Sequence, residues 1–135
     1  MFTDWFHSKR EPRGYKKKIG DFGEKLARRF LKNKGYRILA THFQTRIGEI
    51  DIIARDKDEI VFVEVKTRTS ETFGLPEEAI DWRKQQKLIK TAQEYLFKNH
   101  LEDNPWRIDS VAIEINSQTQ KIKIRHIKAA VEDMR

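Results

Sequence analysis

The sequence of 135 residues contains no cysteine. This absence excludes disulfide bonds, metal sites built on thiolates and a cysteine nucleophile. The sequence also lacks any apolar run that approaches the roughly 18 residues of a membrane-spanning helix, and its N-terminus lacks the long apolar segment of a signal peptide. We therefore expect a cytoplasmic protein without a membrane partner, and the length fits one domain with a modest core.

A surplus of positive charge is the main feature of the composition. The formal net charge is +7, and 38% of the residues are hydrophobic, so we expect the chain to fold. Residues 1–18 hold six basic and two acidic residues, a net charge of +4, which leaves +3 for the rest of the chain. We interpret 1–18 as a basic leader, expected to be flexible, and 19–135 as a single domain. The leader could be a solvated tail or an arm that contacts nucleic-acid phosphates.

Hydrophobic periodicity predicts an α/β protein. Apolar residues recur at helical spacing between Phe22 and Leu31, and Gly35 follows as a natural stop. Two segments rich in Ile and Val are typical of strands. The full prediction is a helix over 20–34, strands over 36–43, 46–55 and 59–67, a loop over 69–76, a helix over 81–98, strands over 107–115 and 121–127, and a short final helix. The order is αβββαβ with one further strand.

Charged residues interrupt the two central strands, in the stretch GEIDIIARDKDEIVFVEVKTR over 48–68. If Lys57 and Asp58 form the turn of an antiparallel hairpin, Asp51 lies opposite Glu64. Directly opposed Cβ atoms are roughly 4.5–5.5 Å apart, and like charges at this distance destabilise a strand pair. A one-residue bulge at the turn would instead move Asp51 to the other face of the sheet.

The same register places Glu49 opposite Lys66, and period-two alternation puts both residues on the face of Asp51 and Glu64. The repulsion between the two carboxylates then needs compensation. A shared proton, the Lys66 amine, or a Mg²⁺ or Mn²⁺ ion held by oxygen ligands could supply it. The structural alternative is a surface ion-pair cluster on a wet sheet face, but apolar residues share this face, which favours a functional site.

Several motifs of the chain together resemble the YraN-like bacterial proteins. These motifs are Gly20-Asp21-Phe22-Gly23-Glu24 with Ala27, Lys34-Gly35-Tyr36, Gly48-Glu49-Ile50-Asp51, Phe62-Val63-Glu64-Val65-Lys66 with Arg68, and Phe73-Gly74 ahead of Lys84. Asp51 and the later Glu64-Val65-Lys66 also resemble the D…(D/E)xK signature of the restriction-endonuclease-like nuclease superfamily. The YraN-like family is similar in turn to archaeal Holliday-junction resolvases, and the resemblance covers about 19–127.

This resemblance implies a restriction-endonuclease-like core, with a central mixed sheet flanked by helices, and the activity of a metal-dependent DNA endonuclease. Asp51, Glu64 and the backbone carbonyl of Val65 would bind Mg²⁺ or Mn²⁺, and Lys66 would orient or activate the attacking water. Glu24 from the first helix would complete the catalytic set. The implied substrate is DNA, branched or damaged, met in repair or recombination, and paired cuts would need a homodimer.

Other polar residues are candidates for supporting roles. Glu49 is one, and Gln85 is another, because it falls within the apolar arc of the second helix and either reaches the central strands or is covered by solvent. Asp109 is expected to be a local cap or an ion-pair partner. The four histidines lack metal-ligand spacing, so we expect them at solvated or edge positions. The candidates for nucleic-acid contacts are Arg46, Arg68, Lys84, Lys87, Lys16 and Lys17.

Two interpretations without catalysis stay open. The first is a nucleic-acid-binding module that keeps the nuclease fold, and it predicts salt-dependent binding to DNA that is indifferent to Mg²⁺. The second is a protein-interaction domain in which the acids form a structural ion network, and it predicts no binding to nucleic acid even at low salt.

Overall fold

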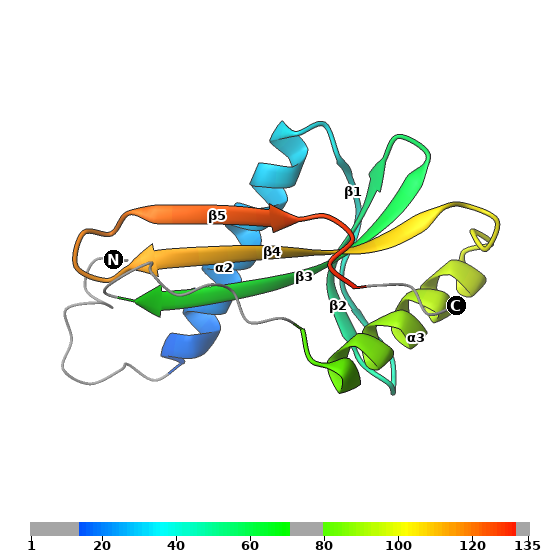
Figure 1. The fold of residues 1–135 in the computed structure, drawn as a ribbon, viewed down its shortest axis with the longest axis horizontal. Coiled ribbons are helices and arrows are strands. Elements are labelled where there is room, and N and C mark those ends of the chain that lie inside the picture. Colours follow the sequence, from blue (N-terminus) through cyan, green and yellow to red (C-terminus); the bar gives the residue numbers. More distant parts are fainter. Residues whose placement is uncertain (1–13, 71–79, 132–135) are drawn as a thin grey trace.

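The computed structural model of the chain describes residues 14–70 and 80–131. Within them, helices and strands follow the predicted order αβββαβ with one further strand (Figure 1). The elements are α2 (Tyr15–Asn33), β1 (Arg37–Gln44), β2 (Glu49–Asp56), β3 (Glu59–Ser70), α3 (Trp82–Lys98), β4 (Trp106–Asn116) and β5 (Ile122–Ile127). The protein is therefore of the α/β class that its periodicity predicts.

The five strands of the described residues form one mixed sheet in the order β1-β2-β3-β4-β5. β3 and β4 pair in parallel, and the other neighbouring strands pair in antiparallel fashion. A parallel pair needs a crossover connection, and α3 lies on the connection between β3 and β4. The mixed sheet that the family resemblance implies is confirmed.

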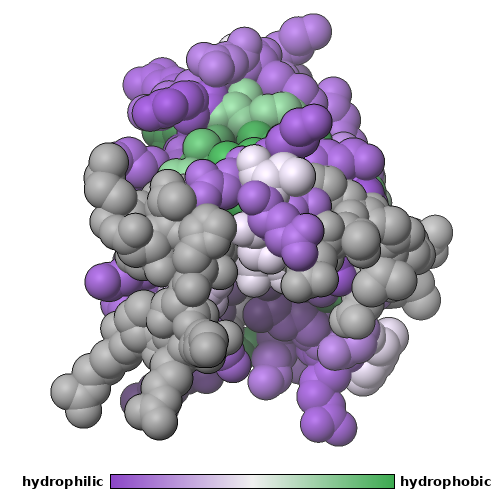
Figure 2. Space-filling model, turned by 90° about the vertical axis from the view of Figure 1, so that its left-hand side faces the viewer, coloured by the Kyte–Doolittle hydropathy of each residue, from purple (hydrophilic) through white to green (hydrophobic). Residues whose placement is uncertain are grey.

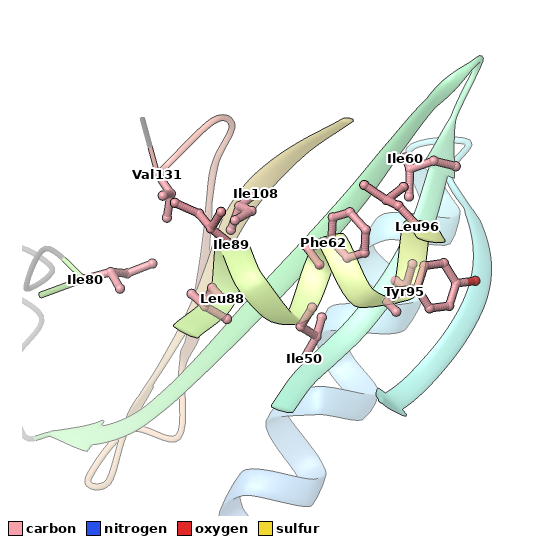
Figure 3. Packing of buried hydrophobic residues seen from close by; sticks show 12 residues of the cluster. Ile50, Ile60, Phe62, Ile80, Leu88, Ile89, Tyr95, Leu96, Ile108 and Val131 are labelled. Carbon is pink, nitrogen blue, oxygen red and sulfur yellow. The ribbon is translucent and has the colours of Figure 1, made fainter. Parts of the chain in front are cut away.

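The two helices cover opposite faces of the sheet. α2 packs on Val61, Val63 and their neighbours, whereas α3 packs on Phe62 and the other residues of its face. Figure 3 shows Phe62 and Ile50 among the side chains that face α3. Because adjacent residues of a strand point to opposite faces, this division follows from the apolar run of β3. In Figure 1, α2 crosses behind β3 and β4, and α3 lies beside β2.

The boundaries of α2 differ from the prediction at one end. The helix begins at Tyr15, so the last residues that we assigned to the basic leader form its first turn, while 1–13 lie outside the described residues. The predicted stop is confirmed, because Gly35 has a left-handed φ of 92° and the N–H of Tyr36 donates to the carbonyl of Leu31 at 3.0 Å. This pattern of bonds is typical of a glycine that ends a helix.

The other end segments are placed differently from the prediction or are not described. β3 continues through Ser70, into the region predicted as a loop, because its parallel pairing with β4 extends to Asn116. The rest of that predicted loop, 71–79, lies outside the described residues, and so does 132–135. No helix follows β5 within the residues described up to 131.

α2 approaches the sheet closely at Gly23. A Cβ atom built on this glycine would lie 1.8 Å from Oγ1 of Thr67 on β3 and 2.8 Å from the Cβ of Thr67. Real Cβ contacts are not this short, so only glycine allows the helix axis to come so near. The next residue, Glu24, is thereby held against the sheet, with 7% of its surface exposed.

A buried ion network joins the hairpin of β2 and β3 to β4 and β5. Asp109 on β4 is fully buried and accepts hydrogen bonds from Arg107, at 2.9 Å, and from His126, at 2.8 Å. Burial tends to raise the pKa of Asp109, but these donors and the N–H of Ala129 outweigh it and lower the pKa. The prediction of an ion-pair partner at Asp109 is confirmed. The guanidinium of Arg107 also contacts Tyr36, Asp56 and Glu59.

No helix in the described parts of the chain is both long enough and apolar enough to cross a membrane.

Candidate functional site at the fork of two strands

The hairpin of β2 and β3 has the predicted register. Asp56 pairs with Glu59, Ala54 with Val61 and Ile52 with Val63, so the turn lies at residues 57 and 58 as predicted. Lys57 adopts a positive φ of 60°, which suits a tight hairpin turn. The backbone pairing of these two strands ends at Ile52 and Val63, one pair before the two acids.

Beyond that pair the strands separate, and we call this point the fork. β2 continues along β1, where Glu49 pairs with Gln44, while β3 continues along β4, where Glu64 pairs with Ser110. At the fork a side chain replaces the backbone as the hydrogen-bond acceptor for β3. Oδ2 of Asp51 accepts a hydrogen bond from the N–H of Val65 at 2.8 Å. Asp51 therefore bonds to the residue that follows Glu64.

Strand alternation in β2 is broken at this position. Ile50 packs in the core beneath α3, whereas Ile52 packs in the core beneath α2. In a regular strand, Ile50 and Ile52 would share a face, because they are two positions apart. The alternation of faces changes at Asp51, where the pairing of β2 with β3 has ended.

The four charged residues consequently do not share one face, contrary to the prediction. Glu49 and Asp51 line a hollow beside α2, together with Glu24 and Thr67. Glu64 lies on the side of α3, where its Oε1 is 3.5 Å from Nζ of Lys84. The two acids of the resemblance thus lie at the fork but approach it from the two sides of the sheet.

The pKa values of both acids at the fork are raised above those of ordinary carboxyl groups. Burial is the largest cause that raises the pKa of Asp51, and Glu49 raises it further, while the N–H of Val65, Lys84 and His42 oppose the rise. Burial also raises the pKa of Glu64, and Asp51 adds to it. The repulsion expected between Asp51 and Glu64 is therefore present, and the nearby cations compensate it only in part.

Two lysines stand near Glu64 and differ in their contacts. Lys84 lies in the first turn of α3, where its N–H donates to the cap residue Asp81 at 2.8 Å, and its amine pairs with Glu64. Lys66 lies two residues along β3 from Glu64, and its charge lowers the pKa of Glu64. Within 14–70 and 80–131, no hydrogen bond or ion pair engages the Lys66 amine. Of the two lysines near Glu64, only Lys84 therefore has an ion-pair partner among the described residues.

Glu24 joins the site from α2 through a histidine. Its Oε1 lies 2.8 Å from Nε2 of His42 and 3.3 Å from Nη1 of Arg28. Nδ1 of the same histidine lies 3.4 Å from Oε1 of Glu49, so His42 bridges two of the predicted residues. Burial is the largest cause that raises the pKa of Glu24, and the charge of Asp51 raises it further.

His42 is the site residue that the sequence interpretation missed. It is 55% exposed in its side chain, as expected for an edge position, yet it contacts two acids of the site. The pairs of β1 with β2 on either side of His42 place it across from Asp51, so this strand register is the signal that could have revealed it. His126 lies on the edge strand β5, as one of the two expected positions for a histidine, but it is not solvated, because its side chain is 2% exposed and bonded to Asp109.

Two of the remaining candidates lie at the hollow. It has a volume of about 270 Å³, and Lys16 and Lys17 belong to its lining. Gln85 instead donates to the carbonyl of Ile80 at 2.6 Å, a local bond next to the start of α3.

The last three candidates lie apart from the acids. Arg68 lies further along β3, where its guanidinium is 3.3 Å from Glu114. Arg46 and Lys87 are exposed and lie near the turn between β1 and β2.

A divalent cation fits the donor set at the fork only in part. Glu64 is buried and Asp51 is half-buried, and their carboxylates offer the oxygen ligands that Mg²⁺ and Mn²⁺ prefer. Within the described residues, however, no three acid or histidine side chains are arranged to hold one ion. The protein would therefore supply two side chains, and the Val65 carbonyl, water or a substrate phosphate would complete the shell.

Comparison with known proteins agrees with the motifs. The profile of "Uncharacterised protein family UPF0102" matches residues 23–113. A UPF0102 protein of Alkaliphilus oremlandii is 49% identical over 114 residues, which cover 84% of this chain and 97% of the relative. Another from Caldanaerobacter subterraneus is 48% identical over 83% of this chain and 93% of its own length. One from Clostridium acetobutylicum is 43% identical over 86% and 95%. This chain therefore belongs to the UPF0102 family.

Proposed function

We propose that this protein is a metal-dependent endonuclease of the restriction-endonuclease-like superfamily, which hydrolyses DNA phosphodiester bonds at the fork of β2 and β3. The observation that supports this most is the pair of neighbouring acids, the buried Glu64 and the half-buried Asp51, with the Lys66 amine near Glu64 and without an ion-pair partner among the described residues. Placing two like charges close together away from water costs stability. A cation bound by both carboxylates would offset that cost.

The chemistry follows from what each side chain can do. Asp51 and Glu64 would hold Mg²⁺ or Mn²⁺, which would polarise a phosphate and lower the pKa of bound water. The Lys66 amine places positive charge next to Glu64, where it can orient the attacking water and stabilise the oxyanion that forms on phosphorus. Glu24 is held at the edge of the site by His42 and can accept a proton from that water. No covalent nucleophile is needed.

DNA is the substrate that the surface charge supports. The chain carries a net charge of +7, and Lys16 and Lys17 line the hollow beside the acids. Figure 2 shows hydrophilic residues over most of the described surface on one side of the molecule. Branched or damaged DNA is the substrate class that we propose, and cutting both strands of a junction would require a homodimer.

A binding module that does not cut is the second candidate, and one observation favours it. The amine of Lys84 already lies 3.5 Å from Glu64, so this carboxylate has a cationic partner without a metal. In that case Lys66 and the other basic residues would only contact phosphates.

The deciding experiment measures cleavage of linear, nicked and four-way-junction DNA with Mg²⁺, with Mn²⁺ and with EDTA. We expect cleavage by the wild type only with metal, and a loss of about 100-fold or more in Asp51→Asn and in Lys66→Ala, the usual scale for a group that stabilises the transition state. Matched controls are Asp58→Asn in the hairpin turn and Lys32→Ala in the last turn of α2, both of which should cut normally.

Two outcomes would contradict the proposal. Unchanged cleavage in both Asp51→Asn and Lys66→Ala would mean that the activity lies elsewhere. Binding of all these DNA molecules with equal affinity in Mg²⁺ and EDTA, with no product, would support the binding module instead.

A further inference from the structure

A second feature lies beside the fork, in a groove between the β1–β2 turn and the second half of α3. The groove has a volume of about 800 Å³. Its basic lining residues among those described are Arg46 from the turn, and Lys90 and Lys98 from α3, against the single acid Glu94. The surplus of positive charge suits a polyanion.

The groove also carries exposed apolar side chains. Phe97 of α3 is 72% exposed, and Ile47 of the turn is 36% exposed. An aromatic ring among cations is the combination with which proteins bind single-stranded nucleic acid, because bases stack on the ring while cations contact the backbone. In a duplex the bases are stacked on each other, so the ring of Phe97 would find no base to stack on.

α3 connects this groove to the fork. Residues 84, 87, 91, 94 and 98 recur at helical spacing and share one flank of the helix. At one end of that flank Lys84 approaches Glu64, and at the other Lys98 lines the groove. These two lysines are about 21 Å apart along the helix at 1.5 Å per residue.

The β1–β2 turn lies directly against this flank of α3. A Cβ atom built on Gly48 would lie 3.1 Å from Oγ1 of Thr91 and 3.6 Å from Cβ of Lys87. The turn leads on to Glu49 and Asp51 of the site. The turn therefore covers the middle of this flank, where Thr91 is fully buried, and joins the groove to the strand that carries Glu49 and Asp51.

We propose that this groove binds a single-stranded segment of the nucleic acid whose phosphodiester bond lies at the fork. Arg46, Lys90 and Lys98 contact its phosphates, and Phe97 stacks on a base. The inference rests on the function proposed for the fork, and it narrows the substrate class to nucleic acid with a single-stranded arm. A second copy of the chain is the other occupant that an apolar groove could take, and the experiment separates the two.

The test measures binding of a fluorescent single-stranded 20-mer and of a blunt duplex of equal length by anisotropy, in EDTA. All proteins carry Asp51→Asn, so that cleavage does not interfere. We expect Phe97→Ala to weaken single-strand binding about 10-fold, on the scale of one lost stacked base, and to change duplex binding less than two-fold. The matched control is Trp82→Ala, because Trp82 is equally exposed, at 70%, and lies outside the groove at the start of α3.

The charges of the groove give a second readout. Lys98→Gln should reduce the slope of log affinity against log salt for the single strand by about 1, the effect of one lost phosphate contact. Lys32→Gln on α2 should leave the slope unchanged. A Phe97→Ala protein that binds the single strand as tightly as its parent, or a Trp82→Ala protein that loses as much, would overturn the proposal.

Two further outcomes keep this inference distinct from the proposed nuclease activity. If Phe97→Ala changes the mass of the particle in sedimentation and not its affinity for the single strand, the groove is a protein interface and the inference fails. In a protein with Asp51 intact, Phe97→Ala should raise KM for a substrate with a single-stranded arm at unchanged kcat. If cleavage depends on metal but Phe97→Ala leaves KM unchanged, the inference about the groove fails. The proposed nuclease function of the fork would still stand.

Discussion

At the scale of single residues, Asp51 is the residue that connects the parts of the candidate site. It ends the pairing of β2 with β3, it bonds to the N–H of Val65, and it interacts electrostatically with Glu24 and Glu64. A carboxylate in this position costs stability when it is charged. This cost is one reason for the proposal that a ligand binds at the fork.

This cost can be measured through the pH dependence of stability. The folded protein raises the pKa of Asp51, so the folded state holds its proton more tightly than the unfolded state does. The corresponding stability is fully present below the usual aspartate pKa and is lost as the pH rises through the folded pKa. Asp51→Asn keeps an acceptor for Val65 but cannot be charged. It should therefore stabilise the metal-free protein at pH 7.5 by about 1 kcal/mol.

The same comparison at low pH is the control. At pH 3, below the usual aspartate pKa, the gain from Asp51→Asn should shrink toward zero, as followed by urea unfolding, because the wild-type side chain then carries a proton in both states. Asp58→Asn in the exposed turn should show no such dependence. An Asp51→Asn protein that is less stable than the wild type at pH 7.5, in the absence of metal, would show that the charge stabilises the fold.

The sequence predicted that Asp51 and Glu64 are neighbours, but it did not predict all of the residues around them. Asp51, Glu64 and Lys66 were predicted because a hairpin register and a family motif point to the same positions. His42 was missed because its partners come from α2 and β2, and because its positive φ of 52° is a backbone conformation that periodicity does not reveal. The change of faces in β2 at Asp51 was missed because the prediction assumed an unbroken alternation along the strand.

At the scale of elements, the contact of α2 with β3 sets the position of Glu24. Gly23 permits that contact, because any side chain would collide with Thr67. Gly20 lies three residues earlier in the same helix, where a built Cβ meets no atom of the described residues within 4 Å. The two glycines form a matched pair in which only the packing differs.

Alanine at these two positions should have opposite effects on stability. Gly23→Ala should destabilise the protein by about 1–3 kcal/mol, the usual cost of overpacking, and the double variant with Thr67→Ala should recover part of it. Gly20→Ala should stabilise by up to about 1 kcal/mol, because alanine favours the helix. Urea unfolding measures both. Equal effects from the two alanines would mean that α2 does not pack on β3 as described.

Element order was predictable and element boundaries were less so. The two apolar faces of β3 indicated a strand covered on both sides, and the helices α2 and α3 provide that cover. The start of α2 at Tyr15 was not predicted, because its first turn is rich in lysine and carries no apolar stripe. The extension of β3 to Ser70 depends on long-range pairing with β4, which local sequence does not encode.

At the scale of the whole molecule, the fork, the hollow beside α2 and the flank of α3 meet where the sheet divides. One helix brings an acid to this point from one face, and the other helix brings a lysine from the opposite face. A polymer that passes over the fork would touch elements from both halves of the chain. This arrangement is the reason for proposing that the site acts on nucleic acid rather than on a small molecule.

Calorimetric titration of Mn²⁺ tests the central claim most directly. The wild type and Asp58→Asn should bind Mn²⁺, and Asp51→Asn should bind it at least 10-fold more weakly, because it loses one of two carboxylate ligands. The titration is repeated with uncleaved DNA bound to a Lys66→Ala protein, since a phosphate oxygen could complete the shell. Binding that depends on Asp51 in either titration is the predicted result. Absence of binding in both, or equal binding by the wild type and Asp51→Asn, would contradict a metal site at the fork.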